Sequence, residues 1–214
     1  MARMYLYTRF ERFWHWVQAL LVLLMLLTGF EIHGTYSLLG FERAVVLHNG
    51  TAFTWGGLYA FILFWLAITG EWRQYLPRLK KVGLVIRYYA IGIFKGEAHP
   101  VHKSPESKHN PLQRLAYLSI LSFLLPFQIV SGLLYYLYNH WPELGINSLL
   151  SLEFVAVAHT LGAFSLLAFV IGHVYMTTTG PKPYTYLAGM ITGYEEEPKE
   201  SLLKKRGLPL GQNE

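Results

Sequence analysis

The chain has 214 residues, of which 53% are hydrophobic and only 14% are charged. Soluble domains carry about a quarter charged residues, so this composition excludes an ordinary soluble enzyme and predicts an integral membrane protein. The absence of cysteine excludes disulfides, thiolate-bound iron–sulfur clusters and covalently attached haem. The formal net charge is +5, and the position of that charge along the chain carries more information than its size.

Four segments have the length of about 20 apolar residues that a bilayer requires. They cover residues 13–32, 53–70, 112–138 and 153–178. The second helix is compatible with an earlier start near Glu42, and Pro126 is expected to kink the third helix. The sequence therefore predicts an all-α membrane protein built as a four-transmembrane-helix bundle.

Two further segments are expected outside the bundle. Residues 82–94 are too few to span a membrane and hold Arg87 at their centre, which predicts an interfacial amphipathic helix between helices two and three. Residues 196–214 are charged and contain Pro and Gly. This composition predicts a charged cytoplasmic tail after one membrane domain that covers residues 1–195.

The lysines and arginines gather on one side of the predicted membrane domain. Of the 18 basic residues, all except Arg43 lie before helix one, between helices two and three, or after helix four. The positive-inside rule assigns these connections to the cytoplasm. Both chain termini are therefore expected in the cytoplasm.

Helix four carries two histidines, His159 and His173, fourteen residues apart. That spacing corresponds to about 21 Å along a helix axis, with the two rings within about 40° of the same face. One metal ion cannot bind both rings. Two separate sites stacked across the membrane can.

Each of these rings needs a partner at its own depth. His15 lies near the cytoplasmic start of helix one, level with His173. His48 and His159 each lie six residues after a glutamate near the outer end of their segment, so they enter the membrane at similar depths. The pairs His15/His173 and His48/His159 suit two b-type haems, each with two axial histidines, in a four-helix bundle.

Other interpretations remain open for several of these residues. His33 competes with His48 for the outer site, but its distance of about 27 Å from His15 along helix one exceeds the spacing on helix four. Any single membrane histidine can be a packed, hydrogen-bonded residue, whereas four at matched depths favour a functional site. Arg12 and Arg43 are candidates to bind haem propionates, and topology-setting charge explains them equally well.

Two further sets of residues receive structural interpretations. The histidines outside the apolar segments are expected to be solvated, and zinc at the first two would lack further ligands. These histidines are His99, His102, His109 and His140. Three pairs of small residues near helix ends are typical of close helix packing. These pairs are Thr28-Gly29, Thr69-Gly70 and Ser131-Gly132.

The chain resembles the bacterial di-haem cytochrome b subunits that anchor NiFe hydrogenases, formate dehydrogenases and thiosulfate reductases. The residues that carry the resemblance lie within about 8–195: Arg12-Phe-Trp-His15-Trp16, Thr28-Gly29, His48, "HNPLQRLAY" (109–117), His159 and His173-Val-Tyr-Met. The resemblance implies an inner haem bound by helices one and four, an outer haem bound by helices two and four, and a multi-pass location in the bacterial inner membrane. The chain is more compact than the larger relatives of the hydrogenase type.

The resemblance also implies a quinone pocket beside the cytoplasmic haem, which maps to His109, Asn110 and Gln113. The alternative for Asn110 is structural, because Asn followed by Pro is a favourable helix start. The two roles do not exclude one another.

We therefore expect an electron-transfer subunit rather than a stand-alone enzyme, with no catalytic side chain and no nucleic-acid partner. It would pass electrons between a periplasmic redox partner and menaquinone or ubiquinone in the bilayer. The resemblance suggests a hydrogenase, dehydrogenase, reductase or multihaem cytochrome as that partner. The alternatives are a transporter or proton channel with a histidine relay, which usually needs membrane-embedded carboxylates, and a purely structural anchor, which needs no matched histidines.

Overall fold

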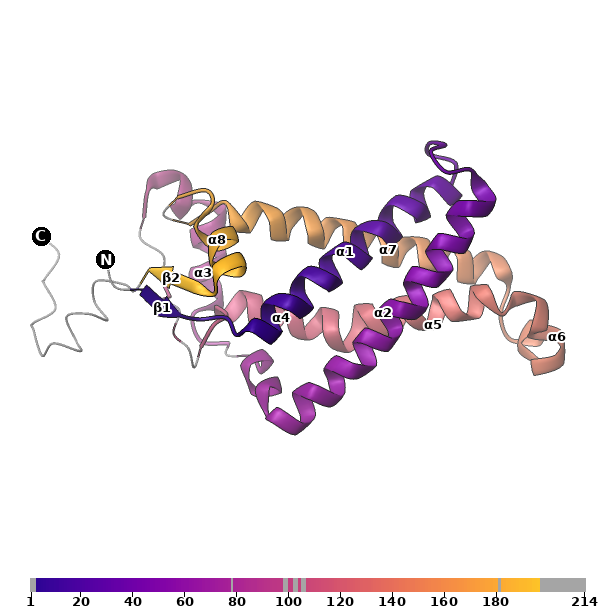
Figure 1. The fold of residues 1–214 in the computed structure, drawn as a ribbon, viewed down its shortest axis with the longest axis horizontal. Helices are drawn as coiled ribbons and strands as arrows, with labels where there is room; N and C mark the ends of the chain where they lie inside the picture. The colour runs from indigo at the N-terminus through magenta and orange to yellow at the C-terminus, as the bar shows by residue number, and fades with distance from the viewer. Residues whose placement is uncertain are drawn as a thin grey trace, which may run out of the picture. The chain divides into compact units, whose positions relative to one another are not determined.

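Four helices of the computed structural model are long and apolar enough to cross a membrane (Figure 1). The structure describes residues 3–77, 79–97, 100–101, 104, 107–180 and 182–196. The spans are α1 (Arg9–Ile32), α2 (Phe41–Thr69), the continuous helix Pro111–Tyr136 and α7 (Leu152–Thr177). The four-helix prediction is confirmed. The second span starts at Phe41, which agrees with the earlier of the two predicted starts.

The third span consists of α4 (Pro111–Ser119), a π-helical turn η3 (Ile120–Leu124) and α5 (Leu125–Tyr136). In the π turn the Leu125 N–H donates to the Ile120 carbonyl. The next carbonyl in this register, that of Leu121, would need an N–H from Pro126, which has none. The Tyr59 hydroxyl on α2 donates to the Leu121 carbonyl instead, at 2.8 Å. The proline therefore produces a π turn whose free carbonyl is satisfied by the neighbouring helix.

The central parts of the four spans form one compact unit, residues 15–76 and 115–173. Its core contains one buried apolar side chain from each span: Leu21, Trp55, Leu125 and Leu166. Most side chains of each span are not buried within the chain. Lipid covers such apolar outer faces in a membrane helix bundle.

A second unit comprises residues 1–14, 77–114 and 174–214, which are described only in part. In it, β1 (Arg3–Tyr5) pairs antiparallel with β2 (Tyr194–Glu196) (Figure 1). In this pairing Tyr5 lies opposite Tyr194. The segment before the first span thus contacts the segment after the fourth. Both described ends of the chain therefore lie on one side of the membrane, as an even number of spans requires.

The connections contain shorter elements. These are η1 (Glu71–Tyr75), α3 (Val82–Ala90), η2 (Gly92–Lys95), η4 (Tyr138–His140), α6 (Trp141–Leu144), η5 (Ile146–Ser148) and α8 (Thr185–Thr192). The helix predicted over residues 82–94 is divided, because α3 ends at Ala90 and a 3-10 turn follows. Arg87 on α3 forms an ion pair with Glu97 at 2.9 Å. The predicted tail beyond Glu196, and His99 and His102, lie outside the described residues.

Candidate functional site

The outer pair of predicted histidines lies together in the structure. His48 on α2 faces His159 on α7, with 6.4 Å between the ring centroids. The ring planes are nearly perpendicular, at 79°. The two residues are more than a hundred positions apart in the sequence, so the packing of the two helices creates the pair.

The inner pair is formed in the same way by α1 and α7. The ring centroids of His15 and His173 are 6.0 Å apart, with 47° between the ring planes. All four histidines lie on long helices, so the helical rise fixes the position of each ring along its helix axis.

Both spacings fit a metal ion held between two opposed imidazoles. A metal–nitrogen distance of about 2 Å and a ring radius of about 1 Å place the two ring centres about 6 Å apart. The separations of 6.0 and 6.4 Å match this value. Each pair is therefore spaced to bind one iron from opposite sides.

The number of ligands indicates which kind of iron site the pairs suit. In the described part of the chain, no group of three or more His, Cys, Asp or Glu side chains could hold a metal ion. A bare ion held by protein needs about four ligands, whereas haem provides four nitrogens and takes two axial side chains. Two histidines per site thus fit haem better than a bare ion.

Hydroxyl groups of neighbouring helices contact the outer pair. Thr28 Oγ1 on α1 lies 2.9 Å from His48 Nδ1, and Ser131 Oγ on α5 lies 3.1 Å from His159 Nδ1. The Gln128 amide nitrogen lies 3.3 Å from His159 Nε2, the atom that would bind iron. The Gln128 side chain would therefore have to turn aside if this atom bound a haem iron.

Aromatic rings surround the inner pair. His15 contacts Trp16 edge to face, at 5.1 Å between centroids. His173 stacks on Phe169 at 5.6 Å and contacts Tyr117 at 6.5 Å. His15 Nδ1 is buried and has no hydrogen-bond partner among the residues that the structure describes. The inner rings are therefore held by packing.

The competing histidine, His33, occupies a different position. Its ring is exposed, and its Nε2 lies 2.9 Å from Thr160 Oγ1 on α7. The Thr160 hydroxyl donates to the Ala156 carbonyl, so His33 Nε2–H is the donor in this contact. The ring that faces His159 belongs to His48.

The two arginines considered for propionates differ in their surroundings. The Arg12 guanidinium donates to the carbonyl of Ile191 on α8, while its buried Nε has no hydrogen-bond partner among the described residues. Arg43 is exposed in the first turn of α2. The propionate role of both residues stays a prediction.

The residues considered for quinone form the start of the third span. The Gln113 N–H donates to Asn110 Oδ1 at 2.8 Å, and the Asn110 N–H donates to Gln113 Oε1 at 3.0 Å. This reciprocal pair is a capping box, and Pro111 occupies the first helical position. Asn110 also donates to the Tyr89 hydroxyl at 3.2 Å. The structural role of Asn110 is thus present, and the quinone role stays a prediction.

Buried charges hold the segment that contains the third candidate, His109. The buried Arg114 guanidinium donates to the His109 carbonyl at 3.2 Å and to the Ser107 hydroxyl at 3.0 Å. Lys108 forms an ion pair with Glu11 at 2.6 Å, with both side chains largely buried. These contacts fix the chain immediately before the third span.

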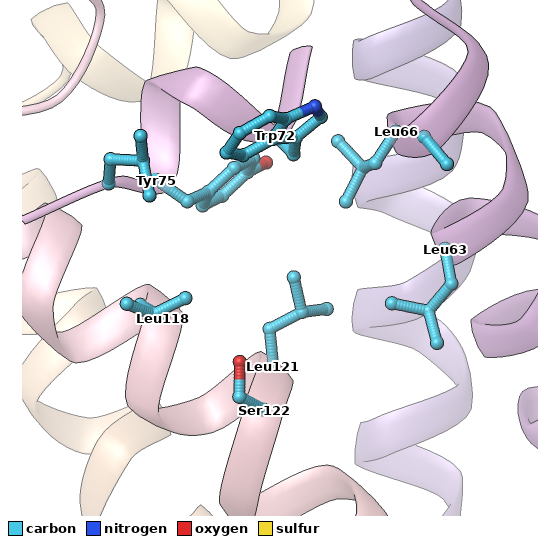
Figure 2. A pocket seen from close by; sticks show the side chains of 9 residues that line it. Leu63, Leu66, Trp72, Tyr75, Leu118, Leu121 and Ser122 are labelled. Carbon is cyan, nitrogen blue, oxygen red and sulfur yellow. The ribbon is translucent and has the colours of Figure 1, made fainter. Parts of the chain in front are cut away.

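A separate apolar pocket of about 340 Å³ lies on α2, η1 and the third span (Figure 2). Its lining residues are Leu63, Leu66, Ala67, Trp72, Tyr75, Leu76, Leu118, Leu121 and Ser122. No histidine lines it, so it is distinct from both histidine pairs.

The sequence interpretation missed the contacts of Thr28, Ser131 and Gln128 with the histidines. It did single out Thr28-Gly29 and Ser131-Gly132, but assigned them only to helix packing. The sequence contained a clue to these contacts. In a helix bundle with buried histidines, a hydroxyl residue followed by glycine can hydrogen-bond an imidazole on the neighbouring helix.

Comparisons with known proteins agree with this geometry. A family model described as Prokaryotic cytochrome b561 matches residues 6–193. A protein of Escherichia coli (strain K12) named "Putative cytochrome YdhU" is 30% identical over 200 residues, which cover 90% of this chain and 74% of that protein. No solved structure is significantly similar to the chain.

Proposed function

The chain belongs to the prokaryotic cytochrome b561 family, and from this premise we propose that it is a di-haem electron-transfer subunit of a respiratory oxidoreductase. Family membership makes it a bacterial b-type cytochrome that transfers electrons in a membrane. We propose that His15 and His173 hold the inner haem and that His48 and His159 hold the outer one. The observation that carries this proposal is the ring separation of 6.0 and 6.4 Å in the two pairs.

The protein residues bind and orient the cofactors and keep water away. Haem, when bound, accepts and donates single electrons, which is the chemistry that the side chains themselves lack. Leu166 lies seven residues from both His159 and His173 and packs in the buried core with Leu21 and Trp55. This apolar core would separate the two sites and keep water from the space between them.

We propose exchange partners on both sides of the cytoplasmic membrane. The outer site would serve a periplasmic redox subunit, and the inner site would serve menaquinone or ubiquinone. The basic connections support this orientation, because the positive-inside rule predicts that the side of the membrane domain near the inner pair faces the cytoplasm. Arg12 and Arg43 are the propionate candidates, and residues 1–195 would form the membrane domain before the charged tail.

Quinone contact with His109, Asn110 or Gln113 requires a local opening, because Asn110 is only 5% exposed. The apolar pocket in Figure 2 is a competing location for a quinone ring. The variants Asn110→Ala and Ser122→Phe distinguish these two locations. The variant at the location that binds quinone should lose quinol-dependent reduction of the haems and keep its haem content.

The surroundings of the carboxylates in the described part of α1 disfavour the relay alternative. Glu11, at the start of the span, forms the ion pair with Lys108. Glu31, near the outer end of α1, is 5% exposed. Its Oε1 accepts backbone N–H groups of Leu38, Leu39 and Gly40 at 2.8, 2.6 and 2.8 Å. This carboxylate is occupied in fixing the outer loop and is not placed for proton relay.

The test of the proposed function is the haem content of the purified chain, measured as the pyridine haemochrome. We expect two haem b per chain, and about one in each of His48→Ala and His15→Ala. His33→Ala is the matched control and is expected to keep two. A chain without haem would refute the proposal, and loss of haem in His33→Ala but not in His48→Ala would reassign the outer ligand.

A further inference from the structure

We propose that Thr28 and Ser131 are positioning residues that orient the outer pair, His48 and His159, and fix the tautomer in which Nε2 carries the lone pair. This inference rests on the proposed function, since it takes these two histidines as axial ligands. Both hydroxyl residues are buried, with 2% and 6% exposure. Each belongs to a different helix from the ring that it contacts.

The hydrogen-bond direction at His48 follows from the single proton of a hydroxyl. Thr28 Oγ1 donates that proton to the Leu24 carbonyl one turn earlier, at 2.7 Å. The 2.9 Å contact between Thr28 Oγ1 and His48 Nδ1 must then be donated by the ring. His48 Nδ1 therefore carries the proton, and Nε2 is left as the ligand atom.

The same logic applies to His159. Ser131 Oγ donates to the Phe127 carbonyl at 2.7 Å and so accepts from His159 Nδ1–H at 3.1 Å. A second contact is consistent with the same tautomer. The Gln128 amide nitrogen lies 3.3 Å from His159 Nε2, and an amide N–H donated there would meet the lone pair that this tautomer leaves on Nε2.

The glycine after each hydroxyl residue makes room for the same ring. A Cβ atom on Gly29 would lie 3.4 Å from His48 Cε1, and one on Gly132 would lie 2.9 Å from His159 Cε1. In Thr28-Gly29 and in Ser131-Gly132, the hydroxyl residue accepts a hydrogen bond from Nδ1 of the histidine, and the glycine leaves space for the adjacent Cε1 of the same ring. The two pairs therefore form equivalent cradles on α1 and α5.

A third dipeptide of this kind, Thr69-Gly70, does not contact a histidine among the described residues, so a hydroxyl residue followed by glycine is not sufficient to form a cradle. Thr69 Oγ1 donates to the Trp65 carbonyl at 2.7 Å, as the other two hydroxyls do. Gly70 has a φ of 75° and ends α2 as its C-cap. Thr69 is exposed and thus provides a matched control.

A hydrogen bond donated by Nδ1–H makes Nε2 of the same ring a stronger electron donor to a bound metal. Stronger donation favours the oxidised iron and lowers the reduction potential. The cradles therefore have two expected effects at the outer site, on haem retention and on potential. The inner site has no such contact to His15 Nδ1 among the described residues.

The test compares Thr28→Val and Ser131→Ala with the controls Thr69→Val and Ser165→Ala. Ser165 is exposed on α7, and its hydroxyl donates to the Leu161 carbonyl. We expect Thr28→Val and Ser131→Ala to raise the potential of one haem and shift one low-spin ferric EPR signal. The other haem and both controls should keep the wild-type values. Haem affinity at the outer site should fall by roughly 10–100-fold, as for other groups that support metal-binding histidines.

Thr28→Ser keeps the proposal testable if Thr28→Val does not retain its outer haem. The serine variant retains the hydroxyl and loses only a methyl group, so it should restore both haem binding and the wild-type potential. Equal behaviour of Thr28→Val and Thr69→Val, or failure of Thr28→Ser to restore binding, would overturn the inference. Wild-type protein without two haems would instead overturn the proposed function on which the inference rests.

Discussion

Around His48 and His159 the neighbouring helices place hydroxyl groups and glycines, whereas His15 and His173 lie among aromatic rings, two of which belong to the same helices as the histidines. The ring separations in the two pairs are nearly equal, at 6.4 and 6.0 Å. The helices therefore provide the same spacing at both depths with different surroundings. Spacing determines whether an iron can be bound, and the surroundings determine how firmly each ring is oriented and how strongly it donates.

On the proposed function, this difference predicts a direction of electron flow through the membrane domain. If the two pairs hold haem as proposed, hydrogen bonds from Nδ1–H would lower the reduction potential of the outer haem, and aromatic packing would leave the inner haem without that effect. The contrast by itself favours electron flow from the outer site to the inner site. A partner that oxidises its substrate outside and a quinone that is reduced near the cytoplasm would use this direction.

The largest expected effect comes from removing the two histidines of α7, one of which belongs to each pair. The double variant His159→Ala/His173→Ala should lose both haems, because each pair retains only one ring. Each single variant should lose one haem, which absorbance spectra of the reduced protein can assign. Retention of two haems in either single variant would show that the pairs do not act as separate sites.

The glycine cradles should give the next largest effect. Gly132→Ala places Cβ 2.9 Å from His159 Cε1, where the ring must shift, whereas Gly29→Ala places it 3.4 Å from His48 Cε1. Overpacking of this kind costs about 1–3 kcal/mol, so outer haem binding should weaken about 5- to 150-fold in Gly132→Ala and less in Gly29→Ala.

Gly57 provides the control for both glycine variants. A Cβ at this position would meet no described atom within 4 Å. Gly57→Ala should therefore keep both haems, and all three variants should leave the inner site unchanged. The ranking is wrong if haem release, measured by transfer to apomyoglobin, is equally fast from Gly29→Ala and Gly132→Ala.

A smaller effect is expected at the inner site from Phe169→Leu. The leucine removes the ring that stacks on His173 at 5.6 Å. An aromatic pair is worth about 0.5–1.5 kcal/mol, so inner haem affinity should fall about two- to tenfold. Phe123, which is 79% exposed, is the control, and Phe123→Leu should have no effect. An effect of Phe169→Leu on the outer haem would contradict the separation of the two environments.

The depth of the four histidines could be predicted because the rise of a helix is constant, so counting residues places each ring along the membrane normal. The contacts of Thr28 and Ser131 could not be predicted in this way. They depend on the rotation of each helix about its own axis and on the distance between helices. For Ser131 the π turn at Ile120–Leu124 adds a further change, because it alters the phase of every later residue in that span.

Short elements were missed for a different reason. The strands β1 and β2 contain three residues each, and their pairing joins the first and last segments that the structure describes. No periodic pattern is visible in three residues, and the partner of each strand lies almost the whole chain away. The capping box at Asn110 and Gln113 was predicted in part. The Asn-Pro dipeptide indicated the helix start, and the structure added the reciprocal hydrogen bonds with Gln113.

The smallest effect is expected from changing Thr160, whose hydroxyl contacts His33, a histidine outside both pairs. Thr160 accepts a hydrogen bond from His33 at 2.9 Å, and it is the neighbour in sequence of His159. The His33 ring is exposed, so Thr160→Val should leave haem content and both potentials unchanged. A shift of the outer potential as large as that of Ser131→Ala would show that any nearby hydroxyl tunes this haem. Unchanged values would show that the effect requires a hydroxyl that accepts directly from the Nδ1–H of a ligand ring.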